Sequence, residues 1–257
     1  MKQKKMGEII VVANQKGGVG KTTTAINLSA ALAIAEKEVL LIDLDPQANS
    51  TTGVGIDKSD GGRDIYSVLV GDSAIHEVIK DTELKFMHLV ASSRELAKFE
   101  LEVVSEEQNH LYLKNALENI RDNYDFIIID SPPSLGLLTI NALTAAHSVV
   151  IPIQAEYYAL EGLSDLINTI QRIKEHFNPY LEIKGALLTM FDDRTNLSRQ
   201  VGEELKKYFQ SKLFEAVIPR NIKLSEAPGF GKPIQLYDIK SAGAKAYMAL
   251  AKEMMKK

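Results

Sequence analysis

The 257-residue sequence predicts an α/β fold, a doubly wound and mostly parallel sheet flanked by helices. Three observations predict it. Apolar strand-like runs alternate with helix-like stretches along the whole chain. The runs are continuously apolar, as expected for strands that helices cover on both faces. A glycine-rich loop joins the first run to the first helical stretch, and this is the edge of the sheet where such folds bind ligands.

The first half of the chain contains four of the expected strands. The run 9–13 leads into the glycine-rich loop, and the alanine-rich stretch 22–35 is the helix that follows it. The run 39–43 ends in a carboxylate. Residues 53–63 are rich in Gly, Asp and Ser, which is typical of a loop within a domain. Apolar runs at 87–91 and 126–130 predict two more strands, and the stretch 108–123 between them predicts a helix.

The second half repeats the alternation. Runs of Val, Ile and Leu predict strands at 149–153, 183–190 and 213–218. Helix-like stretches lie between and after them, at 161–177, 197–210 and 242–256. Strands connected in this way form a parallel sheet with right-handed crossovers. One domain is expected over residues 1–257, with no internal repeat.

The composition is that of an ordinary soluble globular protein, with 45% hydrophobic and 25% charged residues. The sequence contains no cysteine, which excludes disulfides and thiolate metal sites. Its apolar runs are too short for a secretory signal or for a membrane span of about 20 residues. A cytoplasmic protein is therefore expected.

Charge is unevenly distributed along the chain, whose net charge is −4. Residues 184–257 carry 14 Lys and Arg against 8 Asp and Glu, whereas the preceding residues carry 16 basic against 26 acidic side chains. Such asymmetry indicates a basic surface that could bind a polyanion. Ordinary solvated helix faces rich in lysine explain it equally well.

The glycine-rich loop reads Lys16-Gly-Gly-Val-Gly-Lys-Thr-Thr-Thr. It departs from the usual phosphate-loop pattern because Gln15 stands where the first glycine is expected. Lys21 occupies the position that serves a nucleotide bound by the same chain. A second buried cation is costly unless it meets negative charge, so Lys16 is expected to reach phosphate oxygens too. It is free to serve a nucleotide that another subunit holds.

Carboxylates close two of the central strands. Asp130 ends the run 126–130 beside the loop, where it could support Mg²⁺ directly or through water, with the Thr22 hydroxyl on the same ion. Asp43 and Asp45 close the run 39–43, where a carboxylate could orient or deprotonate an attacking water. A strand-end aspartate can instead cap a helix or a turn, and this alternative stays open for Asp43.

These segments resemble the ParA/MinD family of P-loop ATPases, which have a deviant Walker A motif and the SIMIBI-type fold. Within the family the chain is most similar to Soj-like ParA proteins. The resemblance extends over most of the chain, and it is carried by residues 16–24, 43–49, 126–134, 191–198 and 217–221.

The resemblance implies a role for each matched residue. Lys16 crosses a dimer interface to the partner's nucleotide, Lys21 binds the β- and γ-phosphates, and Asp45 positions the hydrolytic water. Magnesium is bound by Thr22 and, through water, by Asp130. The ATP contacts that it implies come from Lys16, Gly17, Gly18, Val19, Gly20, Lys21, Thr22, Thr23, Pro219 and Asn221.

The resemblance also implies an ATP switch. ATP closes a homodimer, the dimer binds double-stranded DNA without sequence preference, and a ParB (Spo0J)-type partner stimulates otherwise slow hydrolysis. Such a protein is nucleoid-associated. Arg194 and Arg220 match DNA-contacting positions, and other basic residues could extend the patch. The loop begins within the first 20 residues, so no N-terminal helix-turn-helix extension is expected.

Four other interpretations share the loop. A MinD-like membrane-cycling ATPase would need an amphipathic C-terminal helix. The stretch 242–256 is instead dominated by alanine, with Tyr247, Leu250 and Met254 at helical spacing. Packing of this helix onto the sheet is therefore favoured, and membrane binding is not expected. An iron–sulfur protein is excluded because the chain has no cysteine. A biotin-pathway synthetase and a nucleotide-binding scaffold stay open, although Lys21, Thr22, Asp45 and Asp130 favour hydrolysis.

Overall fold

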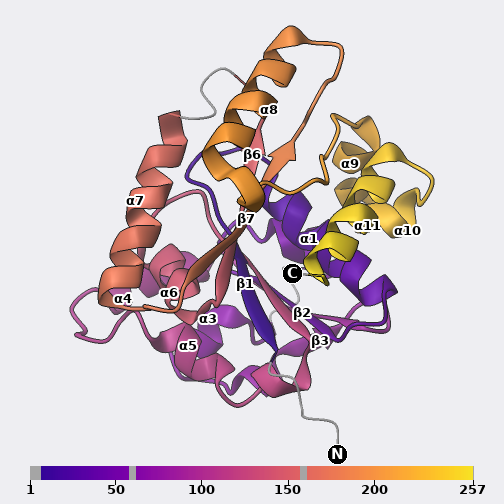
Figure 1. The fold of residues 1–257 in the computed structure, drawn as a ribbon. Helices are drawn as coiled ribbons and strands as arrows, with labels where there is room; N and C mark the ends of the chain where they lie inside the picture. The colour runs from indigo at the N-terminus through magenta and orange to yellow at the C-terminus, as the bar shows by residue number, and fades with distance from the viewer. Residues whose placement is uncertain (1–6, 58–61, 157–160, 257) are drawn as a thin grey trace, which may run out of the picture.

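A single mostly parallel sheet forms the centre of the computed structural model, which describes residues 7–57, 62–156 and 161–256 (Figure 1). In the described residues the sheet has seven strands in the order β3-β4-β2-β5-β1-β6-β7. All neighbouring pairs are parallel except β3 and β4. The strands are β1 (Glu8–Val12), β2 (Val39–Asp43), β3 (Ile79–Asp81), β4 (Met87–Val90), β5 (Phe126–Asp130), β6 (Ser148–Gln154) and β7 (Glu182–Thr189).

Helices cover both faces of the sheet (Figure 1). Side chains of α3–α8 pack on one face, against one set of strand residues that includes Ile9 and Val11. Side chains of α1 and α9–α11 pack on the other face, with Ile10 and Val12. The helices are α1 (Lys21–Ile34), α2 (Asn49–Gly53), α3 (Ile65–Leu69), α4 (Leu96–Glu102), α5 (Tyr112–Leu117), α6 (Leu137–Ala145), α7 (Glu161–His176), α8 (Asn196–Phe209), α9 (Ile222–Glu226), α10 (Ile234–Tyr237) and α11 (Ala242–Met254).

This architecture confirms the doubly wound α/β fold. Successive residues of β1 alternate between the two cores, and all five residues of β2 and of β5 are buried. Burial on both faces explains why the strands are continuously apolar in sequence. The carboxyl ends of β1, β2 and β5 lie side by side at the centre of the sheet, where a doubly wound fold binds its ligand.

One expected strand is wrong. Residues 213–218 form only an isolated bridge between Ala186 and Leu213, beside β7. The backbone amides of Glu215 and Ala216 instead donate to the carboxylate of Glu253 in α11. The Phe214 and Ile218 amides donate to the Ala186 and Leu188 carbonyls of β7, so the segment meets the edge of the sheet at separate points and forms no continuous strand.

The expected helix 108–123 is also shorter than its pattern indicates. It is reduced to α5 and a 3₁₀ turn at Arg121–Asn123. Asn141 of α6 accepts a hydrogen bond from the Leu113 amide and donates one to the Asn109 carbonyl. The Asn141 side chain thus satisfies backbone groups at the start of the helix that would otherwise need further helical turns. Of the expected loop 53–63, residues 58–61 lie outside the described residues, and Gly53 belongs to α2.

The C-terminal helix α11 packs against α1. Tyr247, Leu250 and Met254, the residues at helical spacing, are buried there. The Tyr247 hydroxyl lies 3.2 Å from that of Thr24 in α1. The larger apolar side chains of α11 are therefore used inside the fold. In the part of the chain that the structure covers, no helix has the length and apolar composition to cross a membrane.

Candidate nucleotide site

The glycine-rich loop lies between β1 and α1, as the sequence predicts. Gly18 and Gly20 have φ of 76° and 91°, values that a side chain disfavours. Gly20 caps α1 without a side-chain hydrogen bond, so backbone amides of the first turn stay free for an anion. A Cβ atom added at Gly17 or Gly18 would meet no atom within 4 Å, so this side of the loop is open.

Lys21 begins α1, and 7% of its surface is exposed. Its Nζ donates to the Lys16 carbonyl at 3.1 Å, across the loop. Burial lowers the pKa of the Lys21 ammonium group, and the carboxylates of Asp130 and Asp45 oppose this change. A buried cation with one neutral partner and two nearby carboxylates is well placed to bind phosphate.

Asp130 lies at the end of β5, beside Asp43 of β2, and is fully buried. The Ser50 hydroxyl donates to its Oδ2 at 2.8 Å. Its Oδ1 is buried without a hydrogen-bond partner among the described residues. Burial, followed by the charge of Asp43, raises the pKa of Asp130, while the hydroxyls of Ser50 and Thr22 act in the opposite direction. An orphaned carboxylate oxygen in this position fits a cation ligand, directly or through water.

Asp43 is the structural carboxylate of the site. Its Oδ2 accepts hydrogen bonds from the Thr51 amide at 2.7 Å and the Thr51 hydroxyl at 2.8 Å, and its Oδ1 accepts one from the Asp45 amide. Burial raises the pKa of Asp43, and the bonds from Thr51 lower it. With both oxygens engaged, Asp43 fits the turn-stabilising alternative and not a direct role in hydrolysis.

Asp45 lies two residues further along the same loop and is 8% exposed. Its Oδ1 accepts a hydrogen bond from the Gln47 amide at 2.9 Å. Its charge acts on Lys21 and on Asp130, which places it beside both groups. The sequence prediction that these three residues share one site agrees with this geometry.

Lys16 points away from the interior of the loop. Its Nζ lies 3.3 Å from Glu156 Oε2, and 38% of its side chain is exposed. Its backbone amide donates to the Asn14 side chain, which in turn donates to the Pro152 carbonyl. The Lys16 backbone is therefore anchored, whereas among the described residues its ammonium group has one half-exposed ion pair, which water and salt weaken.

A cavity of about 480 Å³ adjoins the first turn of α1. Gly20 and Thr23 line it on one side, and Pro219 and Asn221 on the other. Thr189, at the end of β7, donates to the Val19 carbonyl at 2.8 Å and holds the loop against this cavity. The sequence assigns ATP contacts to Pro219 and Asn221, and the structure places both in the lining of this cavity.

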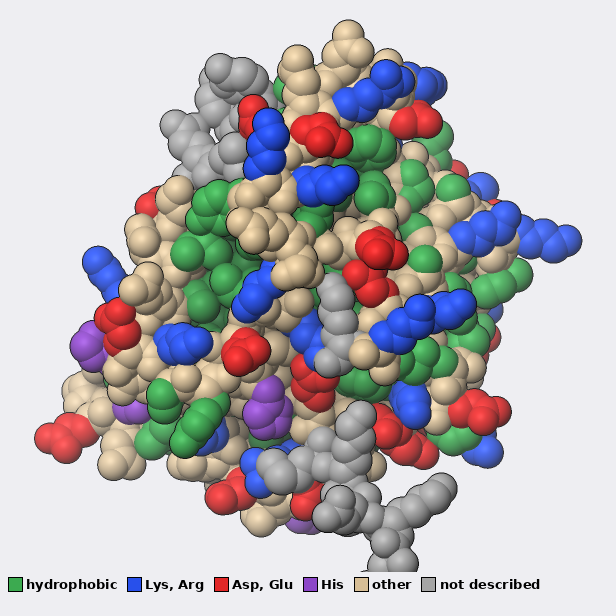
Figure 2. All heavy atoms as spheres, viewed as in Figure 1, with side chains coloured by type: hydrophobic (Ala, Val, Ile, Leu, Met, Phe, Trp, Pro, Cys, Tyr) green, Lys and Arg blue, Asp and Glu red, His purple; other side chains and the backbone are tan. Residues whose placement is uncertain are grey.

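Arg194 and Arg220 are both exposed and lie near one another. Arg194 makes two hydrogen bonds to the Asp192 carboxylate, at 2.7 and 2.8 Å, and these bonds lower the pKa of Asp192 to about 2. The Arg220 amide donates to the Phe191 carbonyl, and its side chain acts on the same carboxylate. Figure 2 shows Lys and Arg side chains scattered among acidic and apolar ones on the visible face.

Several residues of the site carry no motif and were missed in the sequence. They donate hydrogen bonds from their side chains to backbone or carboxylate groups around the site, and they are Asn14, Ser50, Thr51, Ser92 and Thr189. Only proximity in the fold reveals them, since Ser92 and Thr189 are distant in sequence from the groups that they contact. In the regions described, no group of three or more His, Asp or Glu is placed to hold a metal. That suits Mg²⁺, which uses one or two carboxylates together with waters and phosphates.

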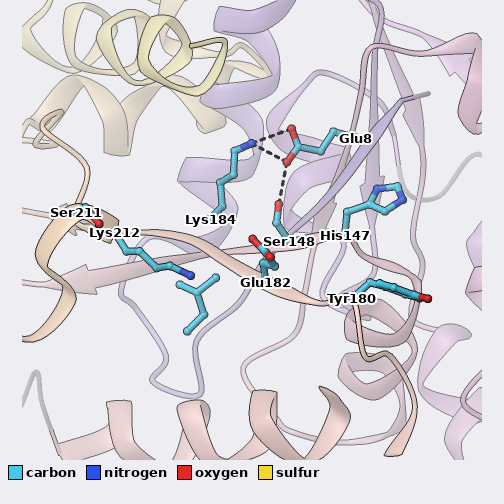
Figure 3. Close-up of a pocket in the computed structure, with 9 residues that line it drawn as sticks. Glu8, His147, Ser148, Tyr180, Glu182, Lys184, Ser211 and Lys212 are labelled. Carbon is cyan, nitrogen blue, oxygen red and sulfur yellow. Dashed lines mark hydrogen bonds and ion pairs between the residues drawn. The ribbon is translucent and has the colours of Figure 1, made fainter. Parts of the chain in front are cut away.

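A second hollow, of about 450 Å³, lies at the opposite edge of the sheet (Figure 3). There Lys184 of β7 donates to both oxygens of Glu8 in β1, at 2.8 and 3.0 Å. The hydroxyl of Ser148 in β6 donates to the same carboxylate at 3.0 Å. The three residues join three adjacent strands at their amino ends (Figure 3), whereas Asp130 stands at the carboxyl end of β5.

The change Lys184→Met is expected to lower the free energy of unfolding by about 1–2 kcal/mol, because it leaves a half-buried carboxylate with one neutral donor. In a chain of this size the Tm should fall by about 4 °C. Thermal unfolding measured by circular dichroism tests this. Lys212→Met, an exposed lysine of the same hollow, is the matched control. Equal Tm values for both variants would show that the ion pair contributes nothing.

The chain is similar to known nucleotide-binding proteins along its length. A family model described as an AAA domain matches residues 7–183. The sporulation initiation inhibitor protein Soj of Bacillus subtilis is 56% identical over 97% of this chain and 98% of its own. The chromosome partitioning protein ParA of Myxococcus xanthus is 52% identical over 98% of this chain and 89% of its own.

The similarity to known proteins also holds for the three-dimensional structure. Cobyrinic acid a,c-diamide synthase from Mycobacterium smegmatis, with bound ATP analog and magnesium, is 35% identical to this chain. The alignment has a TM-score of 0.86 and covers 97% of this chain and 95% of that chain. The similarity therefore includes the sheet, the loop and the helices on both faces.

Proposed function

Because the chain belongs to the ParA/MinD family of P-loop ATPases, with Soj and ParA partitioning proteins among its relatives, we propose that it is an ATP-driven partitioning switch. The observation that carries the proposal is the second lysine of the loop. Lys21 donates to the loop of its own chain, whereas Lys16 has an anchored backbone, and its half-exposed side chain ends at Glu156. A cation presented in this way can reach a nucleotide that a second copy of the chain holds.

The site fits ATP and Mg²⁺. The open side of the loop, the buried Lys21 and the free amides of α1 suit the phosphates. The cavity beside Pro219 and Asn221 suits the base. Thr22 and Asp130 are the candidates for the metal, Asp130 through its unpartnered oxygen. When bound, Mg²⁺ neutralises charge that develops on the transferred phosphoryl group.

In the proposed reaction, Asp45 orients the attacking water, because it follows β2 at the carboxyl edge of the sheet and its charge acts on Lys21. The free chain should turn over slowly. Lys16 rests on Glu156 within its own chain and adds its charge to a partner's nucleotide only after dimerisation. ATP favours the dimer since Lys16 provides a contact that the monomer lacks.

We further propose that the ATP dimer binds double-stranded DNA without sequence preference, and that a ParB-type partner stimulates hydrolysis. Arg194 and Arg220 support this, since both are exposed and act on the same Asp192 carboxylate, and Arg220 lines the cavity that adjoins the loop. Two chains would carry two such pairs. Binding of this kind consists mainly of phosphate neutralisation, so its affinity falls steeply as salt rises.

The test is binding of a DNA duplex of arbitrary sequence with ATP, with ADP and without nucleotide, at low and moderate salt. Binding is expected only with ATP and should weaken about tenfold or more between 50 and 200 mM salt. Arg220→Ala should weaken it further at every sequence tested, because a phosphate contact is lost. Arg121→Ala, at the amino edge of the sheet near Gly7, is the control.

A MinD-like role in membrane cycling is the competing proposal for the same nucleotide chemistry. It requires bulky apolar side chains on one exposed face of a terminal helix. Tyr247, Leu250 and Met254 of α11 are buried against the body of the protein, which disfavours it. If DNA is not bound with any nucleotide, the partitioning proposal fails, and binding to anionic liposomes becomes the measurement to make.

A further inference from the structure

The loop that carries Asp45 is fastened to a neighbouring strand end by Ser92. We propose that Ser92, supported by Thr51, is a positioning residue that sets where the Asp45 carboxylate lies. This inference rests on the proposed role of Asp45 in hydrolysis. It goes beyond that role because it assigns part of the catalytic geometry to Ser92, which follows β4 and belongs to no motif. The hydrogen bonds of Ser92 to the site are those to Asp45 and Thr51.

Ser92 makes two hydrogen bonds to the loop. Its hydroxyl donates to the Asp45 carbonyl at 2.8 Å. Its backbone amide donates to the Thr51 hydroxyl at 3.0 Å. The same Thr51 hydroxyl donates to Asp43, whose other oxygen accepts the Asp45 amide. A closed circuit of four residues therefore holds Asp45 by its amide and by its carbonyl.

The circuit is sealed from solvent. Asp43 and Thr51 are fully buried, Ser92 is 1% exposed and Asp45 is 8% exposed. The Ser92 hydroxyl is itself buried, so solvent does not readily replace it in the circuit when it is removed. Because a backbone group on each side of Asp45 is fixed, the carboxylate moves only within the limits that the circuit sets.

The loop would keep its fold without the Ser92 hydroxyl. The Asp45 carbonyl also accepts the amide of Ala48 at 2.9 Å, and Ser50 independently ties the loop to Asp130. Loss of one hydroxyl should therefore leave the nucleotide contacts in place and change the precision with which Asp45 is held. Displacement of a reacting group by about 1 Å can lower a rate by up to about 100-fold.

The experiment compares Ser92→Ala with Ser93→Ala in the full-length chain with ATP, Mg²⁺ and DNA. Ser93 is the adjacent and partly exposed serine, whose hydroxyl contacts only Glu95 in the described part of the chain. Ser92→Ala should lower kcat for ATP hydrolysis about tenfold, with KM for ATP and the Kd of a non-hydrolysable analogue within about twofold of the unchanged protein. Ser92→Thr, which keeps the hydroxyl, should restore most of kcat.

The outcomes separate this inference from the function on which it rests. Unchanged kcat in Ser92→Ala, together with an inactive Asp45→Ala, would overturn the positioning role and leave the proposed function intact. A lower Tm with normal kcat in the folded protein would overturn it too, since it would assign Ser92 to stability alone. Full turnover by Asp45→Ala would remove Asp45 from the mechanism, and the role of Ser92 with it.

Discussion

Replacing Lys16 with alanine is expected to abolish ATP-dependent dimerisation while ATP still binds to each chain. Lys21, the free amides of α1 and the open loop remain in the variant, so the site within the chain is unchanged. The lost group is the one that faces outward, with 38% of its side chain exposed and a single ion pair to Glu156.

The expected effect of Lys16→Ala is large because a two-fold dimer loses the contact twice. Removal of one partner of a buried charge pair at an interface costs about 2–5 kcal/mol. Two such losses should weaken the dimer by at least about 1,000-fold. Size-exclusion chromatography with light scattering, in the presence of ATP, measures the dimer, and fluorescence titration with an ATP analogue measures binding.

The control for this experiment is Lys98→Ala, an exposed lysine of α4 whose partner is Glu95 of its own turn. It should dimerise normally. An ATP-dependent dimer that persists in Lys16→Ala would contradict the role of Lys16 across the interface. Loss of ATP binding by the same variant would instead place the lysine in the site of its own chain.

The second large effect is expected for Asp45→Ala, which should trap the ATP dimer on DNA. The carboxylate proposed to orient the water is lost, while the loop retains the Asp43, Thr51 and Ser50 hydrogen bonds that shape it. Loss of a general base typically costs about 10²–10⁴-fold in rate. Turnover should therefore fall at least about 100-fold, and the lifetime of the DNA complex should rise accordingly.

Two measurements check this prediction, phosphate release under single-turnover conditions and dissociation from DNA after ATP is removed. Asp72→Ala, an exposed aspartate in the turn after α3, is the control and should behave like the unchanged protein. Normal phosphate release by Asp45→Ala would exclude Asp45 from the hydrolytic step. Rapid dissociation without hydrolysis would break the link between ATP turnover and release.

The central part of the fold could be predicted because it obeys simple periodicities. The strands 39–43 and 126–130 coincide with β2 and β5, since continuous burial leaves an unbroken apolar run. Two segments at the edges of the sheet could not be predicted. Residues 213–218 are as apolar as a strand, yet Glu253, distant in the sequence, takes two of their amides. Strand β3, with only three half-exposed or exposed residues, has no apolar pattern to detect.

The site divides in the same way. Lys21, Asp45 and Asp130 could be predicted because a motif or a strand end places each of them. Asp43 could be assigned only from the structure, which shows both of its oxygens engaged by Thr51 and Asp45. Ser92 and Thr189 had no sequence signal, because a serine or threonine after a strand is common and its partner is a backbone carbonyl far along the chain.

The pairing of β1 with β5 has a consequence for the folding of the chain during its synthesis on the ribosome. Ser131 donates to the Val12 carbonyl across 119 residues of sequence, and Asp130 pairs with Val12 in the ladder. The glycine-rich loop is synthesised before β5, so Asp130 joins it only after residue 130 has left the exit tunnel. Contacts of such long sequence separation form slowly. ATP therefore cannot assist the early steps of folding, and it stabilises only a chain whose central sheet has closed.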